Sequence, residues 1–312
     1  MQNFYKSVAR QLSRGSEVTM ETNIKTGEKA IVNKGAAGIS GDILREHLMP
    51  KPLLILCGAG HVAKSLCSFA VKLGFDVAVM DDRPEFANKV RFPNAKTLWC
   101  APFEVALDNV PHTDNTYFAV LTRDHAHDAA CLERVLLGDY AYAGMIGSKR
   151  KNEMVFAELE KHGISKEKLA TVHAPIGLAI KAATPREIAI SILAQLIEVR
   201  AERRKEESID FDVLAALSNG KVRVLATLIE KEGSAPRGAG AKLALMQDGT
   251  FIGTVGGGKA EGAVIQAARI MSQTKAPQIL DFDMTGKAIT DNNMICGGKI
   301  KVLLEAIVNA QT

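Results

Sequence analysis

Two kinds of hydrophobic pattern alternate along the middle of the chain, from about residue 51 to residue 204. Short apolar runs rich in β-branched residues predict strands at 53–57, 76–80, 96–100, 117–122 and 141–146. Longer helical patterns predict helices at 61–73, 125–137, 149–162 and 185–204. This alternation is typical of a parallel sheet whose strands are joined by crossover helices. We therefore predict an α/β fold with a Rossmann-like parallel-sheet domain over residues 51–207.

The two ends of the chain resemble each other when residue n is set beside residue n + 205. The identities are Val8 with Val213, Leu12 with Leu217, Ser13 with Ser218, Gly15 with Gly220, Thr22 with Thr227 and Ile24 with Ile229. So few identities also fit coincidence. If the ends are duplicated, their halves must pack together, because neither could bury its apolar face alone. Residues 1–50 and 208–312 would then form one discontinuous α+β domain into which the Rossmann-like domain is inserted.

Composition excludes several classes of protein. A chain of 312 residues with 47% hydrophobic and 24% charged residues is typical of a globular protein of about two domains. The net charge of +4 is too small to predict a nucleic-acid surface, and no apolar run approaches the roughly 18 residues that cross a bilayer. Five cysteines without CxxC spacing, and an N-terminus without the apolar core of a secretory signal, favour the cytoplasm. We expect neither nucleic acid nor membrane as a partner.

A glycine-rich turn follows the first strand of the predicted Rossmann-like domain. Gly58, Gly60 and Ala63 have the GxGxxA spacing, and the helix begins at His61. The glycines allow a tight turn and a close approach to a pyrophosphate, whose charge would face backbone N–H groups and the helix dipole. Asp81 ends the second strand, where an acid accepts ribose hydroxyls; this favours NAD over NADP, although the nearby arginine leaves NADP open. The alternative is a Rossmann-like scaffold without a ligand.

Polar residues also follow the fourth and fifth predicted strands. His125 and Asp128 stand where a parallel sheet places its ligands, and they could bind a metal or move a proton. Both equally suit the first turn of a helix, where polar side chains satisfy free backbone groups, and the two interpretations stay open. Ser148, Lys149 and Arg150 follow the fifth strand and suit an anion, although the two cations can also be simply solvated.

The C-terminal segment carries two turns that together suit an anionic ligand and a soft metal. One turn offers backbone N–H groups, the Ser234 hydroxyl and the Arg237 guanidinium to a single anion. The other places Cys296 directly before two glycines, where an accessible thiolate can act as a nucleophile or a metal ligand. The alternative for Cys296 is a small buried residue at a tight turn.

A third turn lies between these two and opens a predicted helix. Gly256, Gly257 and Gly258 allow close backbone approach at the helix N-terminus. Glu261, in the first turn of this helix, is either a partner of the helix dipole or an acid of the site, and we favour the dipole partner.

The combination of motifs resembles the XdhC/CoxI family, whose members are maturation factors for xanthine and carbon monoxide dehydrogenases. The motifs are Gly-Ser-Ala-Pro-Arg, Gly-Thr-Val-Gly-Gly-Gly, Cys-Gly-Gly, Gly-Ala-Gly-His-Val-Ala, Asp-Asp-Arg-Pro-Glu-Phe, Gly-Ser-Lys-Arg-Lys and His-Ala-Pro-Ile-Gly-Leu. In the family the domain with Gly-Ser-Ala-Pro-Arg normally comes first, so the order here resembles a circular permutation. Some members have cysteine where this chain has Lys259, which leaves Cys296 as the only thiol of that domain.

The resemblance implies a factor that binds molybdenum cofactor (molybdopterin) and delivers it to an apo molybdenum hydroxylase of the xanthine dehydrogenase type. Ser234, Arg237 and the three-glycine turn would hold the anionic end of the cofactor, and Cys296 would face molybdenum. The Rossmann-like domain would take NAD or the nucleotide part of a dinucleotide cofactor. A cysteine desulfurase is a further partner if the cofactor is presented for sulfuration, and we expect a homodimer.

Two other functions stay open. A NAD-dependent oxidoreductase would hold its dinucleotide on residues 58–63 and use His125 as the proton donor, and an interaction scaffold would have vestigial sites. We expect a non-catalytic insertion factor, because the turns of the second domain suit an anion and a thiol better than a hydride transfer. If turnover occurs, the candidate groups are Cys296, Glu261, His125 and Asp128.

Overall fold

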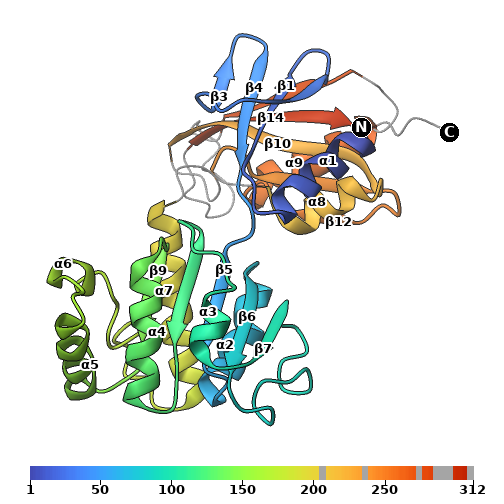
Figure 1. The fold of residues 1–312 in the computed structure, drawn as a ribbon. Coiled ribbons are helices and arrows are strands. Elements are labelled where there is room, and N and C mark those ends of the chain that lie inside the picture. The colour runs from blue at the N-terminus through green and yellow to red at the C-terminus, as the bar shows by residue number, and fades with distance from the viewer. Residues whose placement is uncertain (204–208, 234–237, 272–275, 284–297, 308–312) are drawn as a thin grey trace. The chain divides into compact units, whose positions relative to one another are not determined.

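The structure is a computed structural model that describes residues 1–203, 209–233, 238–271, 276–283 and 298–307 (Figure 1). The chain divides into two compact units, one formed by Met1–Pro50 with Lys205–Thr312 and the other by Lys51–Arg204. The predicted α/β class is confirmed, because one unit holds a parallel sheet and the other two antiparallel sheets. Within the described residues, no helix is both long and apolar enough to span a membrane.

The unit Lys51–Arg204 contains a five-stranded parallel sheet of order β7-β6-β5-β8-β9. Its strands are β5 (Leu53–Cys57), β6 (Asp76–Asp81), β7 (Thr97–Cys100), β8 (Thr116–Val120) and β9 (Tyr142–Met145). All five were predicted from the hydrophobic pattern, with ends that differ by at most two residues. The chain crosses from the edge strand β7 to the far side of β5, so the loops after β5 and β8 lie on either side of the switch point where such sheets bind ligands.

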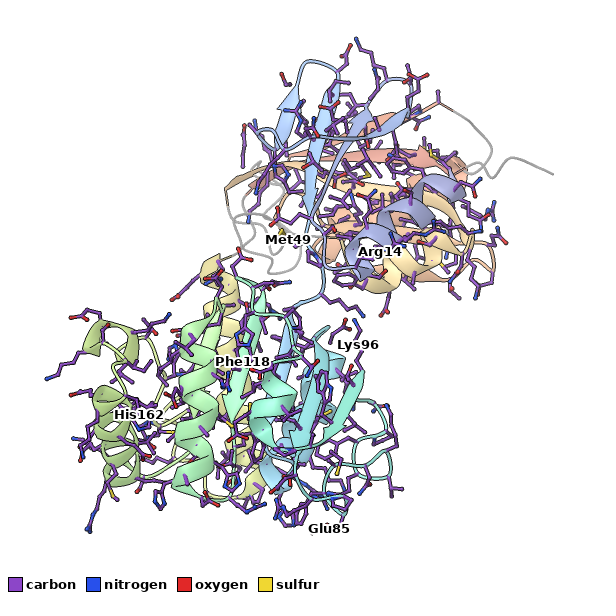
Figure 2. All side chains as sticks on the ribbon, viewed as in Figure 1. Arg14, Met49, Glu85, Lys96, Phe118 and His162 are labelled. Carbon is purple, nitrogen blue, oxygen red and sulfur yellow. The ribbon has the colours of Figure 1, made fainter. Side chains whose placement is uncertain are left out.

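Helices cover both faces of this sheet, which explains why its strands are continuously apolar. Successive residues of β5 point to opposite faces: Leu54 and Leu56 pack with α2 and α7, while Ile55 and Cys57 pack with α3, α4 and α5. Phe118 of β8 (labelled in Figure 2) is fully buried on the face that α3, α4 and α5 cover. The helices are α2 (His61–Lys72), α3 (Phe103–Leu107), α4 (His125–Leu137), α5 (Lys149–Lys161), α6 (Lys166–Leu169) and α7 (Pro185–Arg203).

The other unit is built from two antiparallel sheets of order β2-β1-β4-β3 and β12-β11-β10-β14-β13. The first sheet contains β1 (Val18–Asn23), β2 (Lys29–Val32), β3 (Gly38–Ser40) and β4 (Ile43–Leu48). The second contains β10 (Val222–Gly233), β11 (Lys242–Met246), β12 (Phe251–Gly253), β13 (Gln278–Asp283) and β14 (Gly298–Ala306). Its helices are α1 (Gln2–Ser13), α8 (Phe211–Ser218) and α9 (Gly258–Met271).

The repeat detected between the chain ends is visible in the strand order and the register. The order β2-β1-β4-β3 recurs as β11-β10-β14-β13, and α1 and α8 pack against each other in one shared core. Thr22 lies opposite Lys29 in the first sheet, just as Thr227 lies opposite Lys242 in the second. The strand β12 and the helix α9 belong to the second half alone.

The helix α9 covers one face of the second sheet, and the first sheet covers the other. Val224 and Ala226 of β10 pack against α9, whereas Ile229 and Leu303 contact Leu44 of the first sheet. The first half needs no such helix because its corresponding face is polar. There Thr19 bonds to His47 at 3.0 Å, and Glu21 accepts a hydrogen bond from Arg45 Nε at 2.9 Å.

Two buried ion pairs join the halves across the interface between the sheets. Lys29 Nζ lies 2.7 Å from Glu305 Oε1, and Lys242 Nζ lies 2.6 Å from Glu46 Oε1. The two ammonium groups also donate to Thr22 and Thr227 at 2.9 and 3.1 Å. The lysine side chains are only 2% and 1% exposed. Each half thus supplies the carboxylate that neutralises the buried lysine of the other half.

Candidate functional site

Two of the predicted motifs leave the second sheet from neighbouring positions. Gly233 ends β10 and lies opposite Gly298, the first residue of β14. These glycines flank the segment with Ser234 and Arg237 and the segment with Cys296. Ser234, Arg237 and Cys296 themselves lie outside the described residues. The register therefore brings the flanks of the predicted anion turn and of the predicted thiol turn to the same end of the sheet.

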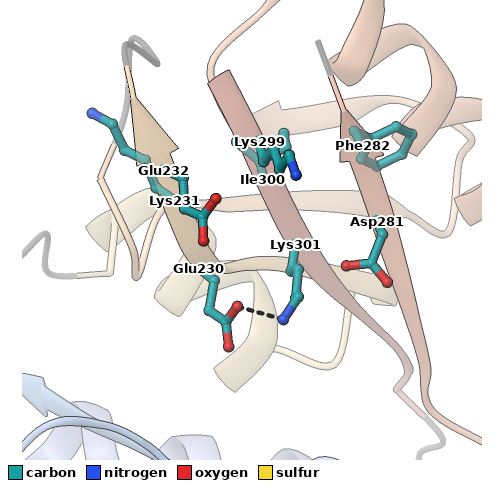
Figure 3. A pocket seen from close by; sticks show the side chains of 8 residues that line it. All are labelled: Glu230, Lys231, Glu232, Asp281, Phe282, Lys299, Ile300 and Lys301. Carbon is teal, nitrogen blue, oxygen red and sulfur yellow. Dashed lines mark ion pairs between the residues drawn. The ribbon is translucent and has the colours of Figure 1, made fainter. Parts of the chain in front are cut away.

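A pocket of about 340 Å³ lies on β10, β13 and β14 close to this end (Figure 3). Charged residues on facing strands dominate its lining, which consists of Glu230, Lys231, Glu232, Asp281, Phe282, Lys299, Ile300 and Lys301. Glu230 and Lys301 form an ion pair at 2.5 Å, and this carboxylate raises the pKa of Lys301. The sequence interpretation missed this pocket, although its signal is present: the facing strands carry Glu-Lys-Glu and Lys-Ile-Lys.

The three-glycine turn before α9 is occupied by a carboxylate of the chain itself. Gly256, Gly257 and Gly258 have φ values of +125°, +76° and +66°, which side chains other than glycine rarely adopt. Glu261 Oε2 accepts the N–H groups of Val255 and Gly257, each at 3.0 Å, and the Thr254 hydroxyl. Burial raises the pKa of Glu261, but these hydrogen bonds outweigh burial and leave the pKa below its usual value. These contacts close the turn that precedes α9 and hold the carboxylate at the helix N-terminus, where the helix dipole favours a negative charge.

The glycine-rich loop after β5 uses its two glycines for different reasons. Gly58 has φ +113°, and a Cβ atom there would lie 2.4 Å from the backbone oxygen of Leu121, at the end of β8. Gly60 has φ −70° and no atom within 4 Å of such a Cβ, so the space beside it is open to a ligand. Ala63 is fully buried, and His61 is exposed at the first position of α2.

Asp81 is engaged with the chain rather than turned toward solvent. It is 1% exposed and accepts hydrogen bonds from Ala59 N at 2.8 Å and from Arg83 Nε at 2.8 Å and Nη2 at 3.0 Å. A ribose would have to displace Arg83 to reach this carboxylate. The next acid, Asp82, is more exposed and is held by Arg123 at 2.6 and 2.9 Å, which lowers the pKa of Asp82 to about 2.

A second pocket, of about 440 Å³, lies at the carboxyl ends of β8 and β9. It is lined mainly by polar and cationic residues: Arg123, Asp124, His125, Ser148, Arg150, Lys151 and Met154. His125 therefore lines a pocket, whereas Asp128 is fully buried, where burial raises its pKa and Lys151 forms an ion pair with it. The cap of α4 is provided by Asp124, which accepts the His127 N–H at 3.0 Å. In the described part of the chain, no three His, Cys, Asp or Glu side chains cluster as metal ligands.

Known proteins resemble both units of the chain. A family model described as the XdhC Rossmann domain matches residues 54–196, and one described as the XdhC and CoxI family matches residues 216–283. A probable xanthine dehydrogenase subunit from Bacillus subtilis is 30% identical over 50% of this chain and 45% of its own length. The molybdenum cofactor insertion chaperone PaoD from Escherichia coli is 35% identical over 31% of this chain and 30% of its own length.

A solved structure, described as a xanthine dehydrogenase from Bacillus halodurans, matches with a TM-score of 0.55 and 26% identity. The match covers 67% of this chain and 66% of that one. The chain spans less than half the length of the curated relatives it matches. The two family models lie in separate units and together cover about two thirds of the sequence. The chain therefore belongs to the XdhC and CoxI family.

Proposed function

We propose that the chain is a maturation factor that binds molybdenum cofactor as its cargo and delivers it to an apo molybdenum hydroxylase of the xanthine dehydrogenase type. Membership of the XdhC and CoxI family supports this function. So do two relatives, one named a molybdenum cofactor insertion chaperone and the other a probable component of xanthine dehydrogenase. Binding by this chain and delivery to a client are our inference.

The pairing of Gly233 with Gly298 is the observation that carries the proposal. It sets the flanks of the Ser234–Arg237 segment and of the Cys296 segment side by side at one end of a sheet. Molybdopterin presents a phosphate and a metal centre, so a site for it needs an anion-binding group close to a soft ligand. On this proposal Arg237 and Ser234 hold the phosphate, and the thiolate of Cys296 approaches molybdenum.

The pocket beside this end supplies further cations. Lys231, Lys299 and Lys301 are matched in number by the three acids of the lining, Glu230, Glu232 and Asp281, so the pocket as a whole is close to neutral. Such a lining can bind the polar groups of a pterin without attracting anions indiscriminately. The three-glycine turn takes a supporting role in this proposal, because Glu261 already occupies its N–H groups.

The test is the molybdenum content of two cysteine variants purified from a molybdenum-replete host. Cys296→Ser should lose most of the molybdenum that co-purifies with the wild-type protein, because a hydroxyl is a poor ligand for a soft metal. Cys100→Ser is the matched control: Cys100 is exposed and lies in the other unit, so its loss should leave the molybdenum content unchanged. Equal molybdenum in wild type and Cys296→Ser would exclude the role assigned to Cys296.

A further inference from the structure

The pocket at the carboxyl ends of β8 and β9 joins the N-termini of two long helices. Asp124 caps α4, and Ser148 caps α5 by accepting the N–H of Lys151 at 3.3 Å; both capping residues line the pocket. The remaining free N–H groups of both first turns, and both positive dipole ends, therefore lie at the pocket. This arrangement is suited to an anion, but helix ends alone do not define a site.

Three cationic side chains line the same pocket, and carboxylates outside the lining hold two of them in place. Arg123 is bound by both oxygens of Asp82, and Lys151 pairs with the fully buried Asp128. Thr122 donates to Asp128 at 2.5 Å and fixes it from the other side. Donors that are already held lose less conformational entropy when a ligand binds.

Arg150 completes the set and differs from the other two. It is exposed, lines the pocket, and forms no ion pair among the residues that the structure describes. Asp124 is the one acid in the lining, and its oxygens accept the His127 ring nitrogen at 2.7 and 2.8 Å. The positive charge of Arg150 is therefore not balanced within the pocket.

The pocket also adjoins the glycine-rich loop through the backbone of the β8–α4 connection. The loop after β5 touches this connection so closely that Gly58 has no room for a Cβ atom against Leu121. The open space beside Gly60 and the cationic pocket therefore lie on neighbouring loops at the carboxyl edge of one sheet. Both positions therefore lie at the sheet edge where open α/β folds bind their ligands.

We propose that this pocket is a phosphate-binding subsite for a nucleoside diphosphate group. Arg150 binds the phosphate oxygens through its guanidinium, while Arg123 and Lys151 act as fixed cations of the same pocket. The α5 N–H groups donate to the same oxygens. This subsite is separate from the cargo site proposed in the other unit, and its test involves neither molybdenum nor Cys296.

Isothermal titration calorimetry, with CDP, ADP and inorganic pyrophosphate titrated separately into the full chain, tests the proposal. Arg150→Gln should weaken binding of at least the two nucleotides about tenfold, the equivalent of about 1.4 kcal/mol. Lys149→Gln is the matched control: it removes the same charge from the same exposed helix turn, but Lys149 does not line the pocket. It should change affinity less than about twofold, since an exposed charge outside the pocket is screened. Both sites are exposed, so both variants should fold.

The two variants distinguish a specific phosphate-binding subsite from general attraction to a basic surface. A tenfold loss in Arg150→Gln with none in Lys149→Gln supports the subsite. Equal losses in both variants would mean attraction to a generally basic surface and would overturn it. Unchanged affinity in Arg150→Gln, or no binding of any of the three probes to the wild type at millimolar concentration, would overturn it as well.

Discussion

At the scale of single residues, the sequence predicts where chemistry can occur better than it predicts what a side chain does there. Asp81 stands where the motif predicts an acid that binds ribose. In the structure, however, its carboxylate oxygens accept hydrogen bonds from Ala59 N and from the Arg83 side chain. The spacing of the motif does not predict this contact, because the Arg83 side chain turns back toward a residue only two positions earlier in the chain. Glu261 is the better case, since an acid in the first turn of a helix has an obvious partner in the helix dipole.

The two glycines of the loop after β5 should respond differently to alanine. Gly58→Ala should lower the free energy of unfolding by about 2–3 kcal/mol, because the new Cβ atom would meet the Leu121 oxygen at a positive φ. Gly60→Ala should cost less, about 0.5–1 kcal/mol, because its surroundings are open and only its role as the N-cap of α2 is affected. Urea denaturation of the two variants measures this. Equal stability losses would show that the loop is packed otherwise.

The carboxylate of Glu261 should make stability depend on pH. Because its pKa is lowered on folding, the carboxylate stabilises the fold above its unfolded pKa, and this stabilisation is lost as pH falls through the lower folded pKa. Glu261→Gln should therefore cost about 1–2 kcal/mol at pH 7. The difference from wild type should shrink below about pH 4.5. Melting temperatures measured from pH 7 to pH 3 test this; a gap that stays constant with pH would contradict it.

At the scale of elements, the sequence revealed the repeat through residues that share one offset. Thr22 and Thr227 differ by 205 positions, but Lys29 corresponds to Lys242 and Glu46 to Glu305, so the offset changes after each loop. An alignment at a fixed offset therefore cannot find the crossed ion pairs. The short helices α3 and α6 were not predicted for a different reason: four or five residues are too few to show the helical periodicity of apolar residues.

The crossed ion pairs predict a specific double-mutant result. Lys242→Met should lower the free energy of unfolding by about 3–5 kcal/mol, because Glu46 would remain buried without its partner. The double variant Lys242→Met with Glu46→Leu should recover more than half of this loss, since no unpaired buried charge remains. Chemical denaturation of the single and double variants measures the coupling. Losses that simply add would show that the two charges do not interact.

At the scale of the whole molecule, the two units differ in how the chain builds them. The unit Lys51–Arg204 is continuous, with its own parallel sheet and two buried cores. The other unit joins both ends of the chain, and one core contains Tyr5 and Val8 together with Val213 and Leu225. The hydrophobic pattern predicted the first unit strand by strand. The hydrophobic pattern could not predict which elements of the two chain ends pack together in the other unit, because contacts between residues two hundred positions apart leave no local periodicity in the sequence.

These differences predict how fragments behave. Residues 51–204 expressed alone should fold cooperatively, as judged by one sharp thermal transition in circular dichroism. Residues 205–312 alone should not, because Lys242 and the apolar face of α8 would lose their partners in the N-terminal half. Adding a peptide of residues 1–50 should restore the transition. A cooperative transition of residues 205–312 without the peptide would contradict this view of the unit.

The central claim is that this chain carries molybdenum cofactor, and the metal and pterin content of the purified wild-type protein tests it most directly. Protein from a molybdenum-replete host should contain molybdenum and a molybdopterin-derived pterin in equal amounts. Protein from a host unable to make the cofactor should contain neither. Bound NAD(H) with no molybdenum or pterin, or none of the three, would contradict the claim.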